Sequence, residues 1–95
     1  NMIHIAPWEC CLGLMAGAGR ILGPLGVLIL YGPFMRGGKH TSQSNAQFDN
    51  SLKERDPAWG IRDLDTVTKV AKSCGLVCSE VVEMPANNLT VVLKR

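Results

Sequence analysis

Histidine and asparagine are the residues of this sequence best suited to chemistry at a binding site. His4 follows a short apolar run, and a free imidazole has a pKa of about 6.5, so His4 is a candidate general base. The amides of Asn1, Asn87 and Asn88 can each donate and accept hydrogen bonds to a ligand. Both interpretations have structural alternatives, because a histidine after a strand can simply pack or cap, and asparagines tolerate a left-handed turn.

The four cysteines lack the spacing of a metal or redox motif. Zinc ligands usually occur as pairs about two to four residues apart in loops, whereas Cys10 and Cys11 are adjacent on a predicted helix and point about 100° apart. For these two, and for Cys74 and Cys78, we expect buried, reduced thiols and no metal site. Reduced thiols are typical of the cytoplasm, and we expect that location, with the nucleus as the alternative.

Two glycine-rich stretches resemble phosphate-binding loops but depart from the motifs at necessary positions. Gly17-Ala18-Gly19 lies inside a predicted helix and has Leu22 where a third glycine is needed. Gly32 to Lys39 follows a predicted strand, but its spacing is one residue too long and His40 stands where serine or threonine is needed. Neither stretch predicts a nucleotide site.

Composition and charge narrow the range of partners. The net charge of +2 is too small to indicate a nucleic-acid partner. The longest run without charge, Ile21 to Met35, is broken by glycines and prolines and is shorter than the roughly 20 residues that span a membrane. At 95 residues, the chain is expected to form one small domain.

The elements that must position these side chains begin with a strand and a helix. Asn1 to Ile5 has the pattern of the end of a buried strand, and a helix of about 15 residues is predicted from Pro7 to a stop at Gly23-Pro24. Glycines inside that helix indicate close packing against a sheet. The apolar face predicted for the helix consists of Trp8, Cys11, Leu12, Met15, Ala18 or Gly19, and Leu22.

A second strand and a second helix follow. Gly26 to Gly32 is a continuous apolar run, typical of a strand buried on both faces of a parallel sheet. After a basic, glycine-rich loop, Ser42 or Ser44 can cap a helix that ends at Arg55.

The last third of the sequence predicts a helix and a hairpin. Asp63 can cap the helix and Gly75 can end it. Strands at 77–84 and 89–94, separated by turn residues, form an antiparallel hairpin. Strands that alternate with helices in this order predict an α/β fold with a mainly parallel sheet and one antiparallel strand.

The predicted elements, in this order, resemble the second half of the class I, S-adenosylmethionine-dependent methyltransferase fold. Five strings also lie in register along the chain: Asn1 to Ile5, Tyr31 to Phe34, Ser44 to Asp49, Asp56 to Asp63 and Met84 to Asn88. More specifically, they resemble the methyltransferase-like protein twenty-six family, formerly catalogued as a domain of unknown function. The resemblance covers nearly the whole chain.

The resemblance implies a partial Rossmann-like sheet. It would contain strands 4, 5, 7 and 6 of the order 3-2-1-4-5-7-6 and finish in the antiparallel hairpin. Residues 1–95 would then be the C-terminal half of the domain, and the half that holds S-adenosylmethionine would precede Asn1. The parent protein is therefore expected to use this cofactor, and this chain alone is not expected to bind it or to be catalytic. Strand 4 would keep an open edge, to which a protein partner can pair.

The resemblance also implies where a site would lie. Ligands of open α/β sheets bind beyond the carboxyl ends of the strands, where the strand order reverses. Asn1, Met2 and Ile3 would contact the cofactor there, and His4 would act as the base if the acceptor has a proton to lose. The residues expected on the acceptor side are Tyr31, Pro33, Phe34, Asn45, Asp49, Trp59, Arg62, Asn87 and Asn88.

Several of these roles have structural alternatives in the sequence. Tyr31 and Phe34 can be core aromatics, and Trp59 can seal a loop over a helix. Asp49 and Arg62 can order loops through ion pairs or can form ordinary surface pairs. For the chain as a whole, the leading hypothesis is the acceptor-side part of a methyltransferase with an unknown acceptor. The alternatives are a non-catalytic truncated isoform that binds a protein through its open sheet edge, and a translation product that folds poorly.

Overall fold

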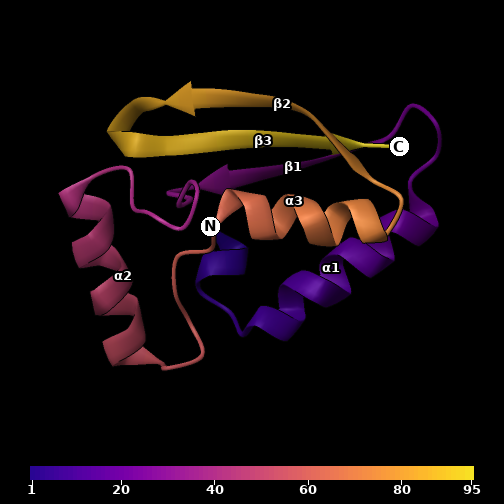
Figure 1. Ribbon diagram of the computed structural model, residues 1–95. Coiled ribbons are helices and arrows are strands. Elements are labelled where there is room, and N and C mark those ends of the chain that lie inside the picture. Colours follow the sequence, from indigo (N-terminus) through magenta and orange to yellow (C-terminus); the bar gives the residue numbers. More distant parts are fainter.

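The three apolar runs of the sequence form one sheet with helices on one of its faces, as Figure 1 shows for the computed structural model, which describes all residues 1–95. The helices are α1 (Trp8–Ile21), α2 (Gln43–Arg55) and α3 (Leu64–Ser73), with short 3-10 turns η1 (Met2–His4) and η2 (Pro85–Asn87). The strands are β1 (Val27–Gly32), β2 (Val77–Met84) and β3 (Asn88–Lys94). No helix is both long and apolar enough to cross a membrane.

The order of strands in the sheet is β1-β3-β2. β3 pairs antiparallel with both neighbours, so Val91 faces Leu30 on one side and Val81 on the other. β1 and β2 consequently run parallel to each other. This is the 5-7-6 end of the expected strand order, and the predicted α/β fold class with its terminal hairpin is confirmed.

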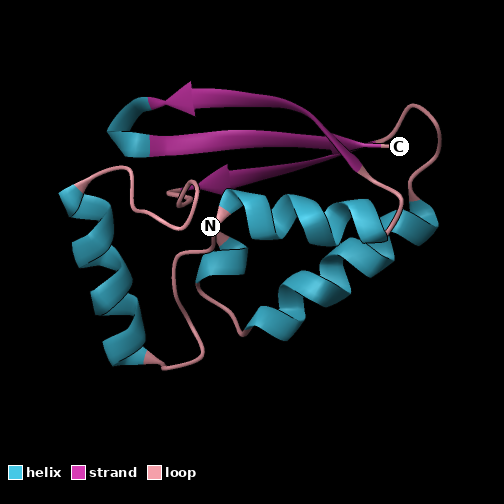
Figure 2. Cartoon of the chain, viewed as in Figure 1, coloured by secondary structure: helices cyan, strands magenta, loops and turns pink.

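One face of the sheet packs on α1 and α3, and this layer contains the core (Figure 2). Every second residue of β3 points into it, which is the period-2 alternation of a strand with one buried face. The buried residues at the centre of this layer are Met15, Leu30, Phe34, Val67, Ala71, Leu76, Leu89, Val91 and Leu93. Removing this apolar surface from water is the main force that holds the two layers together.

The opposite face of the sheet is open. Val27, Ile29 and Tyr31 of β1 are 48%, 58% and 43% exposed. The expectation that this strand is buried on both faces is therefore wrong, because both helices that cover the sheet lie on one side of it.

The predicted strand at Asn1 to Ile5 is also wrong. The amides of His4 and Ile5 both donate to the carbonyl of Asn1, at 2.9 and 3.3 Å, and these local bonds form the turn η1. A run this short carries no periodicity that separates a strand from a turn. With no strand of this chain beside the free edge of β1 to pair with, the backbone hydrogen bonds are satisfied locally. The sheet therefore has three strands rather than the four that the resemblance implies.

The predicted helix ends are confirmed. The Ser42 hydroxyl accepts from the amide of Asn45 at 3.1 Å and caps α2. The Asp63 carboxylate caps α3, and Gly75, with φ of 85°, follows its end. All four cysteines are free, but only Cys11 is fully buried.

The hairpin turn between β2 and β3 contains two residues with left-handed backbone conformations. Ala86 has φ 63° and ψ 32°, and Asn87 has φ 61°, so two consecutive residues are left-handed. Asn87 tolerates this conformation, as predicted, but alanine is strained in it. Ala86→Gly is expected to raise the free energy of unfolding by about 0.5 to 1 kcal/mol in urea titrations. As a control, Ala46→Gly inside α2 is expected to lower the free energy of unfolding by about 1 kcal/mol. A lower free energy of unfolding in both variants would contradict the proposed strain at Ala86.

Candidate functional site

The carboxyl ends of β1 and β2 lie at the same edge of the sheet, together with η1, the loop 33–42, the start of α2 and the hairpin turn (Figure 1). Strand ends of this kind carry the ligand sites of open α/β sheets. Residues that are far apart in the sequence meet there, and most of the predicted site residues are among them.

His4 is completely buried at this edge. Its Nδ1 accepts a hydrogen bond from the backbone amide of Arg62 at 3.0 Å, so the neutral ring carries its proton on Nε2. Nε2 itself is buried without a partner, and the ring packs edge-on against Phe34 with centroids 4.7 Å apart. Burial, then the positive charges of the N-terminus and Arg62, lower the pKa of His4 to about 4, although Asp49 opposes them. At neutral pH, His4 therefore presents an N–H donor, and it can accept a proton only by giving up the bond from Arg62.

Gly32 brings the end of β1 against η1. A Cβ atom at this position would lie 2.6 Å from His4 Nε2 and 2.8 Å from Asn1 Oδ1. Only glycine permits this approach, and it places the amide of Asn1 and the free N–H of His4 at the same point. Asn1 and His4 therefore meet at the end of β1, and not at the end of a strand of their own as predicted.

An apolar groove of about 260 Å³ runs along the unpaired edge of β1. The groove is lined by Asn1, Met2, Ile3, Leu14, Leu28, Ile29, Leu30 and Tyr31. Asn1 and Met2 are exposed beside it, whereas the side chain of Ile3 belongs to the core. Of the three residues expected to contact a cofactor, Asn1 and Met2 therefore offer accessible side chains.

Arg62 holds η1 in place through hydrogen bonds rather than ion pairs. Its guanidinium donates to the carbonyls of Ile3, Ala6 and Ala58 at 2.8 to 3.0 Å and stacks 5.5 Å from the ring centre of Trp8. The ion-pair interpretation of Arg62 is therefore wrong, because backbone carbonyls take up its donors.

Asp49 is buried and is the centre of a charged cluster. Its carboxylate accepts from the amide of Ile61 at 2.8 Å and from Lys53 Nζ at 3.0 Å, and it lies 3.2 Å from His40 Nε2. Burial alone would raise the pKa of Asp49, but these hydrogen bonds and the charges of Lys53 and His40 outweigh it and hold the pKa below its usual value. Asp49 does form ion pairs, with Lys53 of the same helix and with His40 of the loop 33–42. Its link to the loop before α3 is the hydrogen bond from the amide of Ile61.

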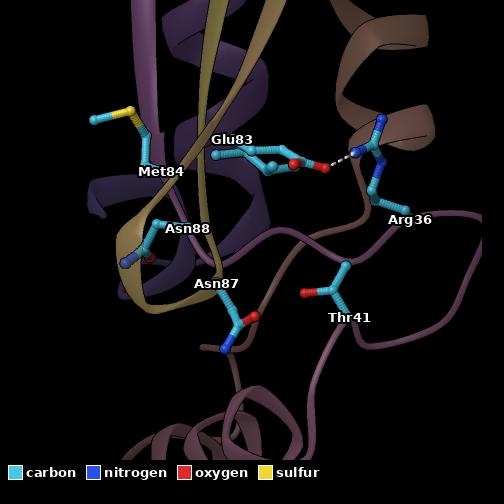
Figure 3. A pocket seen from close by; sticks show the side chains of 7 residues that line it. Arg36, Thr41, Glu83, Met84, Asn87 and Asn88 are labelled. Atoms are coloured by element: carbon cyan, nitrogen blue, oxygen red, sulfur yellow. Dashed lines mark ion pairs between the residues drawn. The ribbon is translucent and has the colours of Figure 1, made fainter.

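A second, polar pocket of about 260 Å³ lies between the loop 33–42 and the hairpin turn (Figure 3). It is lined by Arg36, Thr41, Glu83, Met84, Asn87, Asn88 and Leu89. Asn45 joins its two sides, because its amide nitrogen donates to Thr41 Oγ1 and to the carbonyl of Asn87, each at 3.1 Å. The predicted residues Asn45, Asn87 and Asn88 thus meet at one pocket.

Arg36, Thr41 and Glu83 of this pocket, and His40 beside Asp49, were missed by the sequence reasoning. For Arg36, His40 and Thr41, the only feature of the sequence that points to a site is the basic, glycine-rich composition of the loop after β1. Of the remaining predicted residues, Tyr31 lines the apolar groove, whereas Pro33, Phe34 and Trp59 line neither pocket. Pro33 and Phe34 are buried, Tyr31 is on the open face, and Trp59 is half-buried with the guanidinium of Arg55 5.8 Å from its ring centre.

Solved structures share this fold, and two of the three compared are described as methyltransferase proteins. An O-methyltransferase family protein from Burkholderia thailandensis superposes with a TM-score of 0.82 over 100% of this chain and 28% of its own, at 14% identity. TnmH gives 0.76 over 99% of this chain and 28% of its own, at 20% identity. CalO1, a methyltransferase in calicheamicin biosynthesis solved with S-adenosylhomocysteine bound, gives 0.77 over 97% and 27%, at 13% identity.

This chain therefore spans little more than a quarter of the length of these structures, and at such identities the likeness shows the fold alone. The sequence itself is matched over all of residues 1–95 by one family profile, described as "Protein of unknown function (DUF938)". The chain belongs to the DUF938 family.

Proposed function

We propose that this chain is the acceptor-side part of an S-adenosylmethionine-dependent methyltransferase of the methyltransferase-like protein twenty-six group. The observation that carries the proposal is the sheet order β1-β3-β2 with β3 antiparallel, which superposes over the whole chain on an O-methyltransferase family protein. The methyl acceptor remains the open part of the proposal.

The residues of this chain fit one end of the cofactor. The exposed amide of Asn1 offers hydrogen bonds at the end of β1, beside the apolar groove. The unpartnered Nε2–H of His4 is buried next to it and can reach a ligand only if η1 shifts. The glycine-rich loop 33–42 between β1 and α2 lines the polar pocket rather than this groove, so it does not hold the rest of such a molecule here. When bound, S-adenosylmethionine supplies an electrophilic methyl group, and transfer of that group depends mainly on the positioning of the acceptor.

In this proposal, His4 and Asn1 are positioning residues. His4 is neutral and buried, and its ring is fixed by Arg62 and Phe34, so its N–H points in one direction. A fixed donor costs little entropy when a ligand binds to it. Proton removal from the acceptor would require His4 to release Arg62, which becomes possible only if the loop 58–62 moves.

The open edge of β1 does not require a separate protein-binding function. Because the chain spans only 27–28% of the methyltransferase structures that it matches, the rest of such a fold is enough to account for the unpaired edge and the apolar groove. The truncated-isoform hypothesis has no observation of its own in its favour.

The proposal is tested by titrating S-adenosylhomocysteine into the isotope-labelled chain and following its amide resonances. Tight binding is not expected of this chain alone, but the groove and the Asn1 amide predict weak, saturable shifts at residues 1–4 and 31–34, with a Kd weaker than about 0.1 mM. Tyr31→Ser should reduce the shifts, whereas Val77→Ser, which removes a 58% exposed apolar side chain at the other end of the sheet, should not. Absence of shifts at this edge would refute the proposal, and micromolar affinity would refute the assignment to the acceptor side alone.

A further inference from the structure

The polar pocket of Figure 3 carries one positive and one negative side chain that are only loosely paired. Arg36 Nη1 and Glu83 Oε1 are 3.9 Å apart, compared with about 2.7 to 2.9 Å for a charge-assisted hydrogen bond. The two side chains are 48% and 87% exposed, so the pair contributes little to stability. Both groups are therefore free to bind something else.

Two neutral polar groups of this pocket also have hydrogen-bonding capacity to spare. The Thr41 hydroxyl accepts from Asn45 and keeps its own proton to donate, and the side-chain amide of Asn87 has no partner within the chain. Figure 3 shows the Thr41 hydroxyl directed towards the hairpin turn and the Asn87 amide at the edge of the pocket, on the side away from the Arg36–Glu83 pair.

The backbone that carries Arg36 is fixed. Arg36 and Lys39 exchange two backbone hydrogen bonds at 2.9 and 3.1 Å across Gly37 and Gly38, which have φ of 59° and 77°. The amide of Gly38 also donates to the carboxylate of Asp63. On the other side, Asn45 is 5% exposed and fixes Thr41 against the hairpin turn. A site with a fixed backbone loses less entropy when it binds a ligand.

The pairing of opposite charges decides which ligand fits. A simple anion bound at Arg36 would lie next to the carboxylate of Glu83, and a simple cation bound at Glu83 would lie next to the guanidinium of Arg36. Each would meet like-charge repulsion and would leave one side chain unpaired. A ligand with both charges replaces the pair without either penalty.

We propose that this pocket binds the zwitterionic end of an α-amino acid or a similar molecule, with the carboxylate on Arg36 and the ammonium on Glu83. Thr41 and Asn87 supply further hydrogen bonds. The pocket volume of about 260 Å³ suits such a small polar group. Under the proposed function, this group is the polar end of the methyl acceptor, and only that role rests on the proposed function.

The test compares L-alanine with its two halves, propionate and ethylamine, by amide chemical-shift titration of the labelled chain. Alanine is expected to shift residues 36, 41 and 87–89 and to bind at least about fivefold more tightly than either half. Equal affinity for propionate or for ethylamine would overturn the proposal in favour of a simple ion site. The absence of shifts at the pocket would overturn it as well.

Variants separate the two charges. Arg36→Gln and Glu83→Gln are each expected to weaken alanine binding by at least about fivefold, and the exchange Arg36→Glu with Glu83→Arg should restore most of it. Lys39→Gln and Glu80→Gln change exposed charges on the same turn and strand but outside the pocket, so they should have no effect. If alanine binds and residues 1–4 do not respond to S-adenosylhomocysteine, this inference stands and the proposed function fails. If residues 1–4 respond to S-adenosylhomocysteine and alanine does not bind, the proposed function stands and this inference fails.

Discussion

Lowering the pH from 7.5 to 4.5 is expected to reduce the free energy of unfolding by about 2.5 kcal/mol through His4 alone, given its folded pKa of about 4 and an unfolded value of about 6.5. In the folded chain, a protonated His4 would be a buried charge beside the N-terminus and Arg62, with its Nδ1 already occupied. The unfolded chain has neither obstacle and takes up the proton first. The stabilisation is therefore complete above about pH 6.5 and is lost progressively as the pH falls to about 4.

Urea unfolding followed by circular dichroism at a series of pH values measures the slope of the free energy of unfolding against pH. Asp49 also has a lowered pKa, but its contribution is lost only as the pH falls below the ordinary carboxyl value of 3.8, outside the window of His4. His4→Gln keeps an acceptor for the amide of Arg62 and removes the titrating group, so most of the slope between pH 6.5 and 4 should disappear. An unchanged slope in this variant would show that another group causes the acid sensitivity.

The secondary structure could largely be predicted from the sequence because its signals are local. The apolar run of β1, the Asp63 cap and the Gly75 stop each act within a few residues of themselves. The turn at Met2–His4 could not be predicted, because a short apolar run becomes a strand only if a neighbouring strand is available.

The candidate site depends on contacts that no local pattern encodes. The sequence indicates that His4 can titrate, but its proton position is set by an amide 58 residues later. Arg36 and Glu83 meet only because β1 and β2 run parallel on either side of β3. Asn45 was predicted through the resemblance, yet its role as the link between loop and hairpin becomes clear only in three dimensions. Sequence reasoning therefore identified residue types well and their partners poorly.

The contact between α1 and α3 explains one of the helical glycines and gives the second large stability effect. A Cβ atom at Gly19 would lie 2.4 Å from the carbonyl oxygen of Cys74, at the end of α3. The sequence predicted close packing for these glycines, but against the sheet, and the structure shows that the partner of Gly19 is a helix end. Because the obstructing atom belongs to the backbone, no side-chain rotation relieves the clash.

Gly19→Ala is expected to reduce the free energy of unfolding by about 2 kcal/mol, because α1 must move away from α3 and this cost exceeds the gain in helix propensity. Gly13→Ala is the matched control in the same helix, since a Cβ atom at position 13 meets nothing within 4 Å. That variant should gain about 0.5 to 1 kcal/mol from helix propensity alone. Urea titrations of both variants at pH 7.5 should therefore shift the midpoint in opposite directions. A gain in both would mean that α1 and α3 do not touch at Gly19 in solution, and a loss in both would mean that α1 tolerates no added side chain along its length.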